Sequence, residues 1–455
     1  MANAIAKIKN KFSMTPEKRK IFFNSNWQLM DKFLRLGINL IVSIWIARYL
    51  GPEQFGQYNF AISFVTIIAA VVPLGLANII VKELVQDPGN KNEILGTVST
   101  LRLCSGLIAF AITIVLAFMI PGQDPMVRWS IVIIAANMLF QPLDVISQWF
   151  DSTVEAKYAV YAKGIAFAMT SVMKVLLIVF HSSLIWFAAS YALELILGYL
   201  FLLFTQRKKI SLTKWTFNWK LGKRLTNSSW PLIVAGISTI IYLKIDQVML
   251  SYMINDTAVG IYAVAARLSE VWYVIPTVVA ASYFPSMIKN KQLGPEVYKT
   301  ELQKLYNLLF WFALCICIAV TLMAKPVISI LYGQEYIESI GILVIHVWAC
   351  LFIFMRAALN KWIISEGMYR FELISQVMGA VTKIVVNLIL IPLFGGVGAA
   401  IGTVLAFIVS SYAFTFLFKE TRVSGVMMSK TLISPVTAII AKLKPGKAKL
   451  PANQE

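Results

Sequence analysis

The chain has 455 residues, of which 58% are hydrophobic and 14% are charged, and its formal net charge is +19. Soluble domains carry about 25% charged residues, so this composition excludes an ordinary soluble protein and indicates a membrane protein. The cysteines all lie within apolar stretches and lack metal-ligand spacing to a histidine, so we expect neither a disulfide framework nor a metal centre. They are Cys104, Cys315, Cys317 and Cys350.

Long apolar stretches recur along the whole chain, and about twelve of them could cross the roughly 30 Å of hydrocarbon in a bilayer. In chain order they are 26–48, 57–81, 95–120, 127–150, 158–180, 183–205, 226–253, 258–287, 304–324, 338–360, 371–393 and 396–418. The sequence therefore predicts an all-α membrane protein with about twelve transmembrane helices. Residues 1–25 lack the apolar core and the small-residue cleavage site of a signal peptide.

Basic residues precede the first stretch, follow the last, and fill the segments after the sixth and eighth. They are Lys7, Lys9, Lys11, Lys18, Arg19, Lys20, Arg207, Lys208, Lys209, Lys214, Lys220, Lys223, Arg224, Lys289, Lys291, Lys299, Lys304, Lys419, Arg422, Lys430, Lys442, Lys444, Lys447 and Lys449. Twelve crossings place all these segments on one side, and the positive-inside rule makes that side cytoplasmic, with both termini. The net charge therefore records membrane topology, and no nucleic-acid partner is expected.

The two halves of the chain share a sequence register. Trp27 matches Trp230 and Pro73 matches Pro276 at an offset of 203, and Lys174 matches Lys383 at an offset of 209. Six crossings per half give both halves the same orientation, so we predict two lobes related by a parallel pseudo-two-fold repeat. The predicted lobes are 1–206 and 224–420, joined by a basic cytoplasmic linker, 207–223, and followed by a basic cytoplasmic tail, 421–455.

Pro73 and Pro276 interrupt the second and eighth stretches at matching places. Proline removes a backbone donor and bends a helix, and corresponding broken helices indicate a site or a hinge in transporters. We predict a hinge at both prolines, although ordinary packing is an equally simple explanation of each.

The first stretch carries a polar stripe at helical spacing, which contains Gln28, Asp31, Lys32, Arg35, Asn39 and Ser43. Asp31 and Arg35 are one turn apart and could pair. Charges in hydrocarbon are costly and usually face a bundle interior, so we predict that Asp31, Lys32 and Arg35 line a hydrophilic cavity. The alternative is that these side chains extend to the cytoplasmic surface from near the helix end.

The eighth stretch carries Arg267 and Glu270 about ten residues in, and both are candidates for substrate contacts. The planar guanidinium group offers two parallel donors, which suits a phosphate group. An internal Arg267–Glu270 pair that fixes helix packing is the alternative.

Further charged and polar residues lie within other apolar stretches. The candidates for substrate contacts are Asp144, Lys174, Arg356 and Lys383, and others in these stretches include Lys163, Glu194, Lys244, Asp246 and Asn387. Any one of them could instead form a structural ion pair. Together they predict an interior that holds charges of both signs with an excess of positive charge, which suits an anionic, hydrogen-bonding cargo.

The sequence contains no Gly-rich Lys motif of the Walker type, so this chain is not expected to use ATP itself. His181 and His346 belong to no ligand or triad spacing. We find no catalytic constellation and expect a transporter without cofactors, not an enzyme.

Two motifs resemble a known family. Residues 47–58 (ARYLGPEQFGQY) resemble the first external turn of bacterial polysaccharide and O-antigen flippases of the Wzx type. Residues 246–250 (DQVML) and 260–265 (GIYAVA) resemble that family's second-half signature. These flippases belong to the multidrug/oligosaccharidyl-lipid/polysaccharide (MOP) exporter superfamily, and the resemblance covers about residues 20–420.

The resemblance implies two six-helix lobes forming a V in the bacterial cytoplasmic (inner) membrane. It implies alternating access that carries a polyprenyl-diphosphate-linked oligosaccharide to the outer leaflet. Membrane lipids and polysaccharide assembly proteins are the implied partners. Helices one and eight would border a lateral opening, where Asp31, Arg35 and Arg267 match by position and charge.

Some members of the superfamily hold sodium among helices seven, eleven and twelve. Asp246 and Asn387 could fit such a coupling-ion site, and proton coupling is the alternative. Lys383 lies one turn from Asn387, and its ammonium group could replace the cation.

Two other functions remain open. A drug or cation exporter of the same superfamily would favour an acidic, aromatic cavity. A membrane-embedded glycan-modifying enzyme would usually need a long external loop or a histidine-centred site.

Overall fold

The computed structural model describes residues 16–119, 122–206 and 211–443, and this part of the chain is helical without any strand. The α-helices of the first half are α2 (Pro16–Ala69), α3 (Ala77–Gln86), α4 (Lys91–Met119), α5 (Pro125–Ala135), α6 (Val145–Ser152), α7 (Lys157–Val179) and α8 (Leu184–Gln206). Those of the second half are α9 (Trp219–Met253), α10 (Asp256–Glu270), α11 (Val274–Leu293), α12 (Pro295–Leu331), α13 (Ser339–His346), α14 (Ala349–Glu366), α15 (Tyr369–Ser411) and α16 (Arg422–Leu443).

The prediction of an all-α membrane protein is confirmed. Among the described residues, 9 helical segments are long and apolar enough to cross a membrane. The count rises to 10 if the bent pair Pro125–Leu139 and Gln141–Ser152, which meet at 43°, is a single span.

Two of the long helices contain a break at a glycine. The candidate span Met30–Ala69 has 40 residues. At 1.5 Å per residue a straight helix of this length would extend about 60 Å, twice the hydrocarbon thickness. Gly51 interrupts it with φ 69, and Gly395 interrupts α15 with φ 55. Both values lie in the region that glycine tolerates best, so α2 and α15 each contain two helices. The total of twelve crossings and the repeat relation stay predictions.

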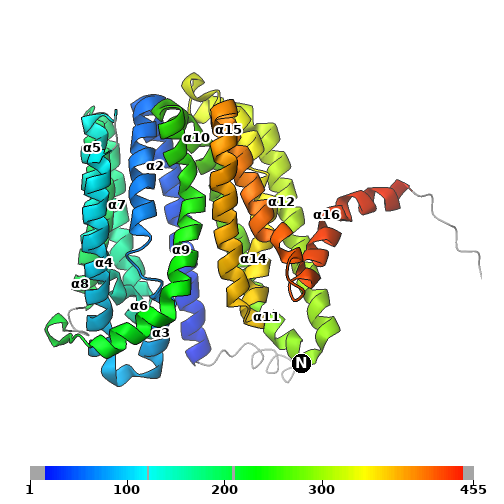
Figure 1. The fold of residues 1–455 in the computed structure, drawn as a ribbon, viewed down its shortest axis with the longest axis horizontal. Coiled ribbons are helices and arrows are strands. Elements are labelled where there is room, and N and C mark those ends of the chain that lie inside the picture. The colour runs from blue at the N-terminus through cyan, green and yellow to red at the C-terminus, as the bar shows by residue number, and fades with distance from the viewer. Residues whose placement is uncertain (1–15, 120–121, 207–210, 444–455) are drawn as a thin grey trace, which may run out of the picture.

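The two halves of the chain lie side by side (Figure 1). Helices α4, α5, α7 and α8 form one side and α12, α14 and α15 the other, with α2, α9 and α10 between them. Of the predicted linker 207–223, residues 207–210 lie outside the described part, and α9 begins within it, at Trp219.

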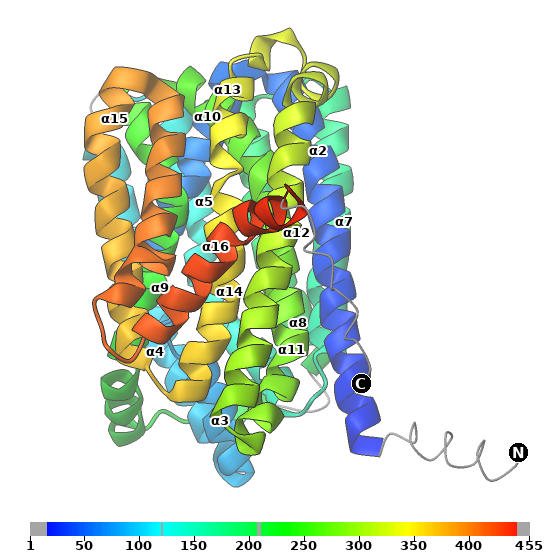
Figure 2. The same ribbon diagram turned by 90° about the vertical axis from the view of Figure 1, so that its right-hand side faces the viewer.

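The predicted tail begins as a helix. Helix α16 slants across α12 and α14 (Figure 2). Tyr306 and Ser424 share a hydrogen bond, and Gln303 Nε2 donates to Thr431 Oγ1 at 2.8 Å, so α16 packs on α12 through polar contacts. Residues 444–455 of the predicted tail, and residues 1–15 of the first predicted lobe, lie outside the described part.

Helical breaks lie beside both predicted hinge prolines. After α2 ends at Ala69, a turn contains Pro73, and Leu74 and Gly75 have φ 52 and φ 62, before α3 begins. In the second half a 3-10 turn, Val271–Tyr273, separates α10 from α11, and Pro276 lies in the first turn of α11. The geometry places a break at both prolines, and hinge motion there stays a prediction.

The halves touch through backbone atoms where α2 crosses α10. A Cβ added at Gly56 would lie 1.7 Å from the carbonyl oxygen of Asp256, and one at Gly260 would lie 2.0 Å from that of Pro52. Only residues without a side chain permit this approach, so the two glycines bring the halves into direct contact. The Gly56 and Gly260 motifs recognised in the sequence thus meet at the boundary between the halves.

Candidate functional site

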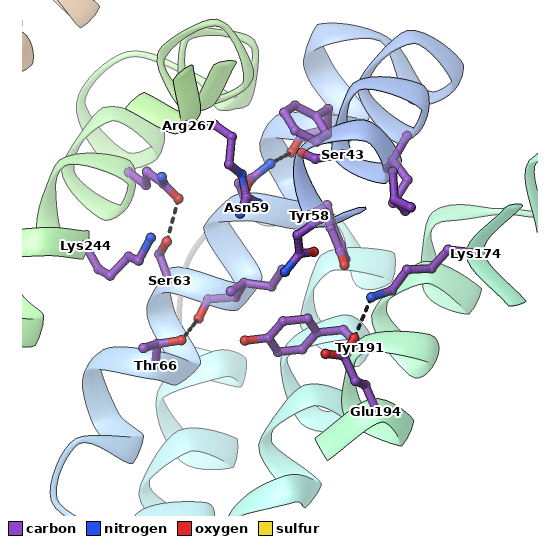
Figure 3. Close-up of a pocket in the computed structure, with 16 residues that line it drawn as sticks. Ser43, Tyr58, Asn59, Ser63, Thr66, Lys174, Tyr191, Glu194, Lys244 and Arg267 are labelled. Atoms are coloured by element: carbon purple, nitrogen blue, oxygen red, sulfur yellow. Dashed lines mark hydrogen bonds and ion pairs between the residues drawn. The ribbon is translucent and has the colours of Figure 1, made fainter. Parts of the chain in front are cut away.

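A cavity of about 250 Å³ lies between the two halves, beside the Gly56–Gly260 contact. Helices α2, α7, α8, α9 and α10 supply its walls (Figure 3). Its polar and charged lining residues are Asn39, Ser43, Tyr58, Asn59, Ser63, Thr66, Lys174, Tyr191, Glu194, Lys244, Gln247 and Arg267. We call this space the central cavity. Such a concentration of polar groups in an apolar bundle marks a site for a polar ligand.

One cation of the central cavity is neutralised by the protein. Lys174 Nζ lies 2.8 Å from Glu194 Oε2, and the two side chains are 5% and 18% exposed. Thr170 also donates to Glu194. This pair joins α7 to α8 at the cavity wall and contributes no net charge.

The other two cations are not neutralised. Lys244 and Arg267 line the central cavity from the second half, and no hydrogen bond or ion pair joins either of them to another described residue. The predicted alternative, an Arg267–Glu270 ion pair, does not form. Two cations without a carboxylate within ion-pair distance give the cavity a surplus of positive charge, because its one described carboxylate, Glu194, is already bound by Lys174.

A second pocket of about 170 Å³ shares Asn39 and Arg267 with the central cavity. Its remaining lining is mostly apolar and consists of Leu36, Leu40, Glu270 and Val271. Arg267 therefore lies where a polar space meets a more apolar one, between the N-terminal part of α2 and α10. We call this second space the seam pocket.

The polar stripe of the first stretch divides between two places. Asn39 and Ser43 face the central cavity, whereas Asp31 and Lys32 line a separate hollow of about 190 Å³ with Asp151. Arg35 Nε donates to Asp31 Oδ1 at 2.8 Å, which is the pairing that the spacing allowed. The Asp31–Arg35 pair lies against α7.

Asp144 and Arg356 are engaged in buried or half-buried pairs away from the central cavity. Lys163 Nζ lies 2.6 Å from Asp144 Oδ1, and Gln148 Nε2 donates to Asp144 Oδ2. Arg356 lies 2.7 Å from Glu372 Oε2 and donates to the backbone of α15. These contacts tie helices together within one half, so the structure does not bring either residue to the cavity.

Asp246, Lys383 and Asn387 come together in the second half, between α9 and α15. Lys383 Nζ lies 2.7 Å from Asp246 Oδ2, and Asn387 Nδ2 donates to Asp246 Oδ1 at 2.7 Å. The side chains of Lys383 and Asp246 are 1% and 3% exposed. None of the three lines the central cavity, although Gln247, the next residue, does.

These contacts show whether the three residues could hold a free cation such as sodium. A hard cation needs several oxygen ligands around it. Here both oxygens of Asp246 accept from nitrogen groups, and the hydroxyl of Tyr262 also donates to Oδ2. The place next to the carboxylate is therefore filled by the ammonium group of Lys383, and the residues do not fit a sodium ion.

Comparison with known families decides the relationship of this chain. A family model described as "Polysaccharide biosynthesis protein" matches residues 22–291, more than half of the chain. The chain belongs to the polysaccharide biosynthesis protein family. The family assignment agrees with the resemblance carried by residues 47–58 and 246–265.

Two relatives of known name align with most of this chain. It is 21% identical over 415 residues to the "Capsular polysaccharide biosynthesis protein CapF" of Staphylococcus aureus, covering 87% of this chain and 99% of that protein. It is 24% identical over 339 residues to the "Putative O-antigen transporter" of Shigella flexneri, covering 71% and 79%.

Two solved structures show the fold. The "Lipid II flippase MurJ, inward closed conformation" has a TM-score of 0.70 at 12% identity and covers 93% of both chains. The inward-facing "multidrug resistance MATE family transporter of the MOP superfamily" has a TM-score of 0.67 at 17% identity, covering 86% of this chain and 94% of that one.

Sequence reasoning missed several cavity residues of this family member. Tyr58, Asn59, Ser63 and Tyr191 line the cavity but carry no charge, and nothing in the sequence distinguished them from packing residues. Lys244 was recognised as an intramembrane charge without being assigned to the site. The carboxylate of Asp246, two residues further along α9, binds Lys383 and not Lys244.

Proposed function

We propose that this chain flips a polyprenyl-diphosphate-linked oligosaccharide from the cytoplasmic to the outer leaflet, for the synthesis of cell-surface polysaccharide. Three facts support the proposal: membership of the polysaccharide biosynthesis protein family, relatives named as an O-antigen transporter and a flippase, and the fold shared with a lipid II flippase. The proposed location is the bacterial cytoplasmic membrane, with both termini cytoplasmic as the basic segments require.

The observation that carries the proposal is the pair of cations without partners in the central cavity. An isolated charge in an apolar bundle costs several kcal/mol, and an anionic ligand removes that cost when it binds. Lys244 and Arg267 are both available to such a ligand. A diphosphate offers several acceptor oxygens and negative charge, and a guanidinium group binds it through parallel hydrogen bonds.

The two adjoining spaces also suit an amphipathic cargo. Apolar residues form half of the lining of the seam pocket, whereas polar and charged residues form most of the lining of the central cavity, and Arg267 lines both. The isoprenoid chain of the cargo would lie in the seam pocket and its diphosphate at Arg267. Its sugars would lie among the hydroxyl and amide groups of the central cavity. Tyr58, Asn59 and Gln247 are suited to sugar hydroxyls because they donate and accept hydrogen bonds.

We propose that Asp31, Lys32 and Arg35 guide the head group toward the cavity, since they lie on the same helix as Asn39 and Ser43. Release would require the Gly56–Gly260 contact to separate, with bending at the breaks beside Pro73 and Pro276. Partner proteins of polysaccharide assembly would then take up the released cargo.

The rival functions fit this cavity less well. A cationic drug would be repelled by Lys244 and Arg267. A glycan-modifying enzyme would usually need a histidine-centred site, whereas the described lining of the central cavity holds no histidine and its one carboxylate, Glu194, is bound by Lys174.

The test is complementation of a flippase-deficient strain, followed by measurement of surface polysaccharide. Arg267→Ala and Lys244→Ala should each reduce polysaccharide at least about tenfold at equal protein level, because each loses about one charge-assisted contact. The matched controls are Arg370→Ala and Lys289→Ala, which remove the same residue types from exposed positions. Normal polysaccharide in both cavity variants would overturn the proposal.

A further inference from the structure

A buried cluster in the second half holds a charge that the transport proposal does not use. It consists of Asp246 on α9, Tyr262 on α10, and Lys383, Asn387 and Thr403 on α15. Each of the five residues is at most 3% exposed. The cluster is separate from the central cavity, whose lining contains none of them.

Every polar contact of the Asp246 carboxylate comes from a donor. Lys383 Nζ lies 2.7 Å from Oδ2, Asn387 Nδ2 lies 2.7 Å from Oδ1, and Tyr262 donates its hydroxyl to Oδ2. Lys383 also donates to the hydroxyl of Thr403, which lies 3.4 Å from Oδ2. The ammonium group thus lies between a carboxylate and a hydroxyl group.

The cluster contains further oxygen atoms beside the two that contact the ammonium group. Asn387 Oδ1 is buried and has no hydrogen-bond partner among the described residues. The hydroxyl of Tyr262 lies 3.3 Å from that of Thr403, and the carboxylate of Asp246 and the hydroxyl of Thr403 both contact the ammonium group directly. Oxygen ligands with a carboxylate are the chemistry that a small alkali cation requires, and the ammonium group of lysine is a compact point charge of the same sign.

We propose that Lys383 is a tethered cation that occupies, by its own side chain, the place of a free monovalent cation. The ion pair is permanent in the intact protein, because separating two charges that are almost fully buried leaves both without solvation. Without the lysine side chain, the oxygens of the cluster would bind a free cation such as sodium.

This inference does not depend on the cargo. It does concern the energy source of transport, because Asp246 lies on the same helix as two residues of the central cavity. Gln247 follows Asp246 directly, and Lys244 lies about half a turn before it. Helix α9 is thereby held to α15 by a fixed charge pair, and movement of α9 does not require a sodium ion to bind or leave at Asp246.

The experiment measures the melting temperature of the purified full-length protein in sodium, potassium or choline chloride at equal ionic strength. The intact protein should show the same midpoint in all three salts. Lys383→Ala should gain a sodium-dependent rise of at least about 2 °C, because a cation that binds only the folded state stabilises it. Adding Asp246→Asn to this variant should abolish the gain.

Arg356→Ala is the matched control, because it also removes a cation from a pair with a carboxylate in the same half. Its midpoint should not depend on sodium, since Glu372 is 27% exposed and can be solvated by water. A sodium-dependent rise of the same size in this control would overturn the proposal, because the effect would then be general.

Three other results would overturn it: a sodium-specific rise in the intact protein that Asp246→Asn removes, no salt dependence in a folded Lys383→Ala variant, or a gain that survives Asp246→Asn. If Lys383→Ala is recovered unfolded in choline, sodium present throughout purification should restore folded protein, and failure to do so counts against the proposal. These measurements do not use transport, so they are distinct from a failure of the flippase assignment.

Discussion

Lys174 and Lys383 hold matching places in the two halves of the sequence, yet the structure uses them differently. Lys174 pairs with Glu194 at the wall of the central cavity, where that carboxylate is 18% exposed. Lys383 pairs with Asp246, which is 3% exposed and lies outside the cavity. Both distances are close to 2.8 Å, so the difference lies in the surroundings. The Lys174–Glu194 pair joins α7 to α8 beside the space that a ligand would fill, and the Lys383–Asp246 pair joins α9 to α15 away from it.

The largest expected effect comes from breaking the buried pair. Lys383→Ala leaves the carboxylate of Asp246 without its cation and should lower the free energy of unfolding by about 3–5 kcal/mol in sodium-free buffer. Chemical unfolding in detergent measures this change. The neutral pair Lys383→Met with Asp246→Asn should recover most of the loss, and equal instability of the single and double variants would contradict the explanation.

The next effect concerns the Gly56–Gly260 contact, which lies beside the central cavity and its Lys174–Glu194 pair. Gly56→Ala places a methyl group where the carbonyl oxygen of Asp256 now lies, so α2 and α10 must move apart, at a cost of about 1–3 kcal/mol. Opening this contact should expose the cavity wall but not the protein interior.

Thiol labelling followed by peptide mass spectrometry distinguishes the wall of the central cavity from the protein interior. In a Gly56→Ala background, labelling of Ser43→Cys in the cavity should accelerate, while native Cys350, which is fully buried, should stay unlabelled. Gly236→Ala is the matched control, because an added Cβ there meets nothing within 4 Å. Equal labelling in both backgrounds would show that the glycine contact does not close the cavity.

Breaking the Lys174–Glu194 pair should destabilise the protein less than breaking the Lys383–Asp246 pair. Lys174→Ala leaves Glu194 without its cation but with 18% of its side chain exposed, so we expect a loss of about 1–3 kcal/mol in the free energy of unfolding. The same chemical unfolding series measures it beside Lys383→Ala. A loss as large as that of the buried pair would mean that the central cavity is dry and would remove the contrast between the two lysines.

The smallest effect on stability belongs to the cations without partners. Arg267→Ala and Lys244→Ala remove like charges that share one cavity and break no ion pair, so stability should stay within about 0.5 kcal/mol or rise slightly. Surface polysaccharide should nevertheless fall strongly in both. A large loss of stability would show that these side chains hold the fold together, and their availability to an anion would then be in doubt.

Several features were accessible from the sequence because they depend on local chemistry. The apolar stretches predicted the helices, the spacing of Asp31 and Arg35 allowed their pairing, and Pro73 and Pro276 indicated the places where helices break. Arg267 was expected about ten residues into its apolar stretch; it lies in the last turn of α10, within the candidate span Asp256–Leu293, and it faces the space between the halves.

The partners of the charged residues were not accessible in the same way. Lys174, Lys244 and Lys383 each lie within an apolar stretch, and nothing in their local sequence tells which of them has a carboxylate partner. Glu194 and Asp246, the partners of Lys174 and Lys383, lie on other helices, so helix packing determines which lysine receives a carboxylate. Arg356 and Asp144 show the same limit, since both were candidates for the cavity and both are engaged by neighbouring helices.

The sequence by itself determined that this protein is a bundle of membrane helices with charges inside, because hydrophobicity and helical spacing are properties of neighbouring residues. It also carried the family, through motifs of a few consecutive residues. Only the tertiary structure decided which charges cancel. Lys383 is neutralised and Arg267 is not, because the packing of α9 against α15 brings a carboxylate to one, while the cavity beside α10 brings none to the other.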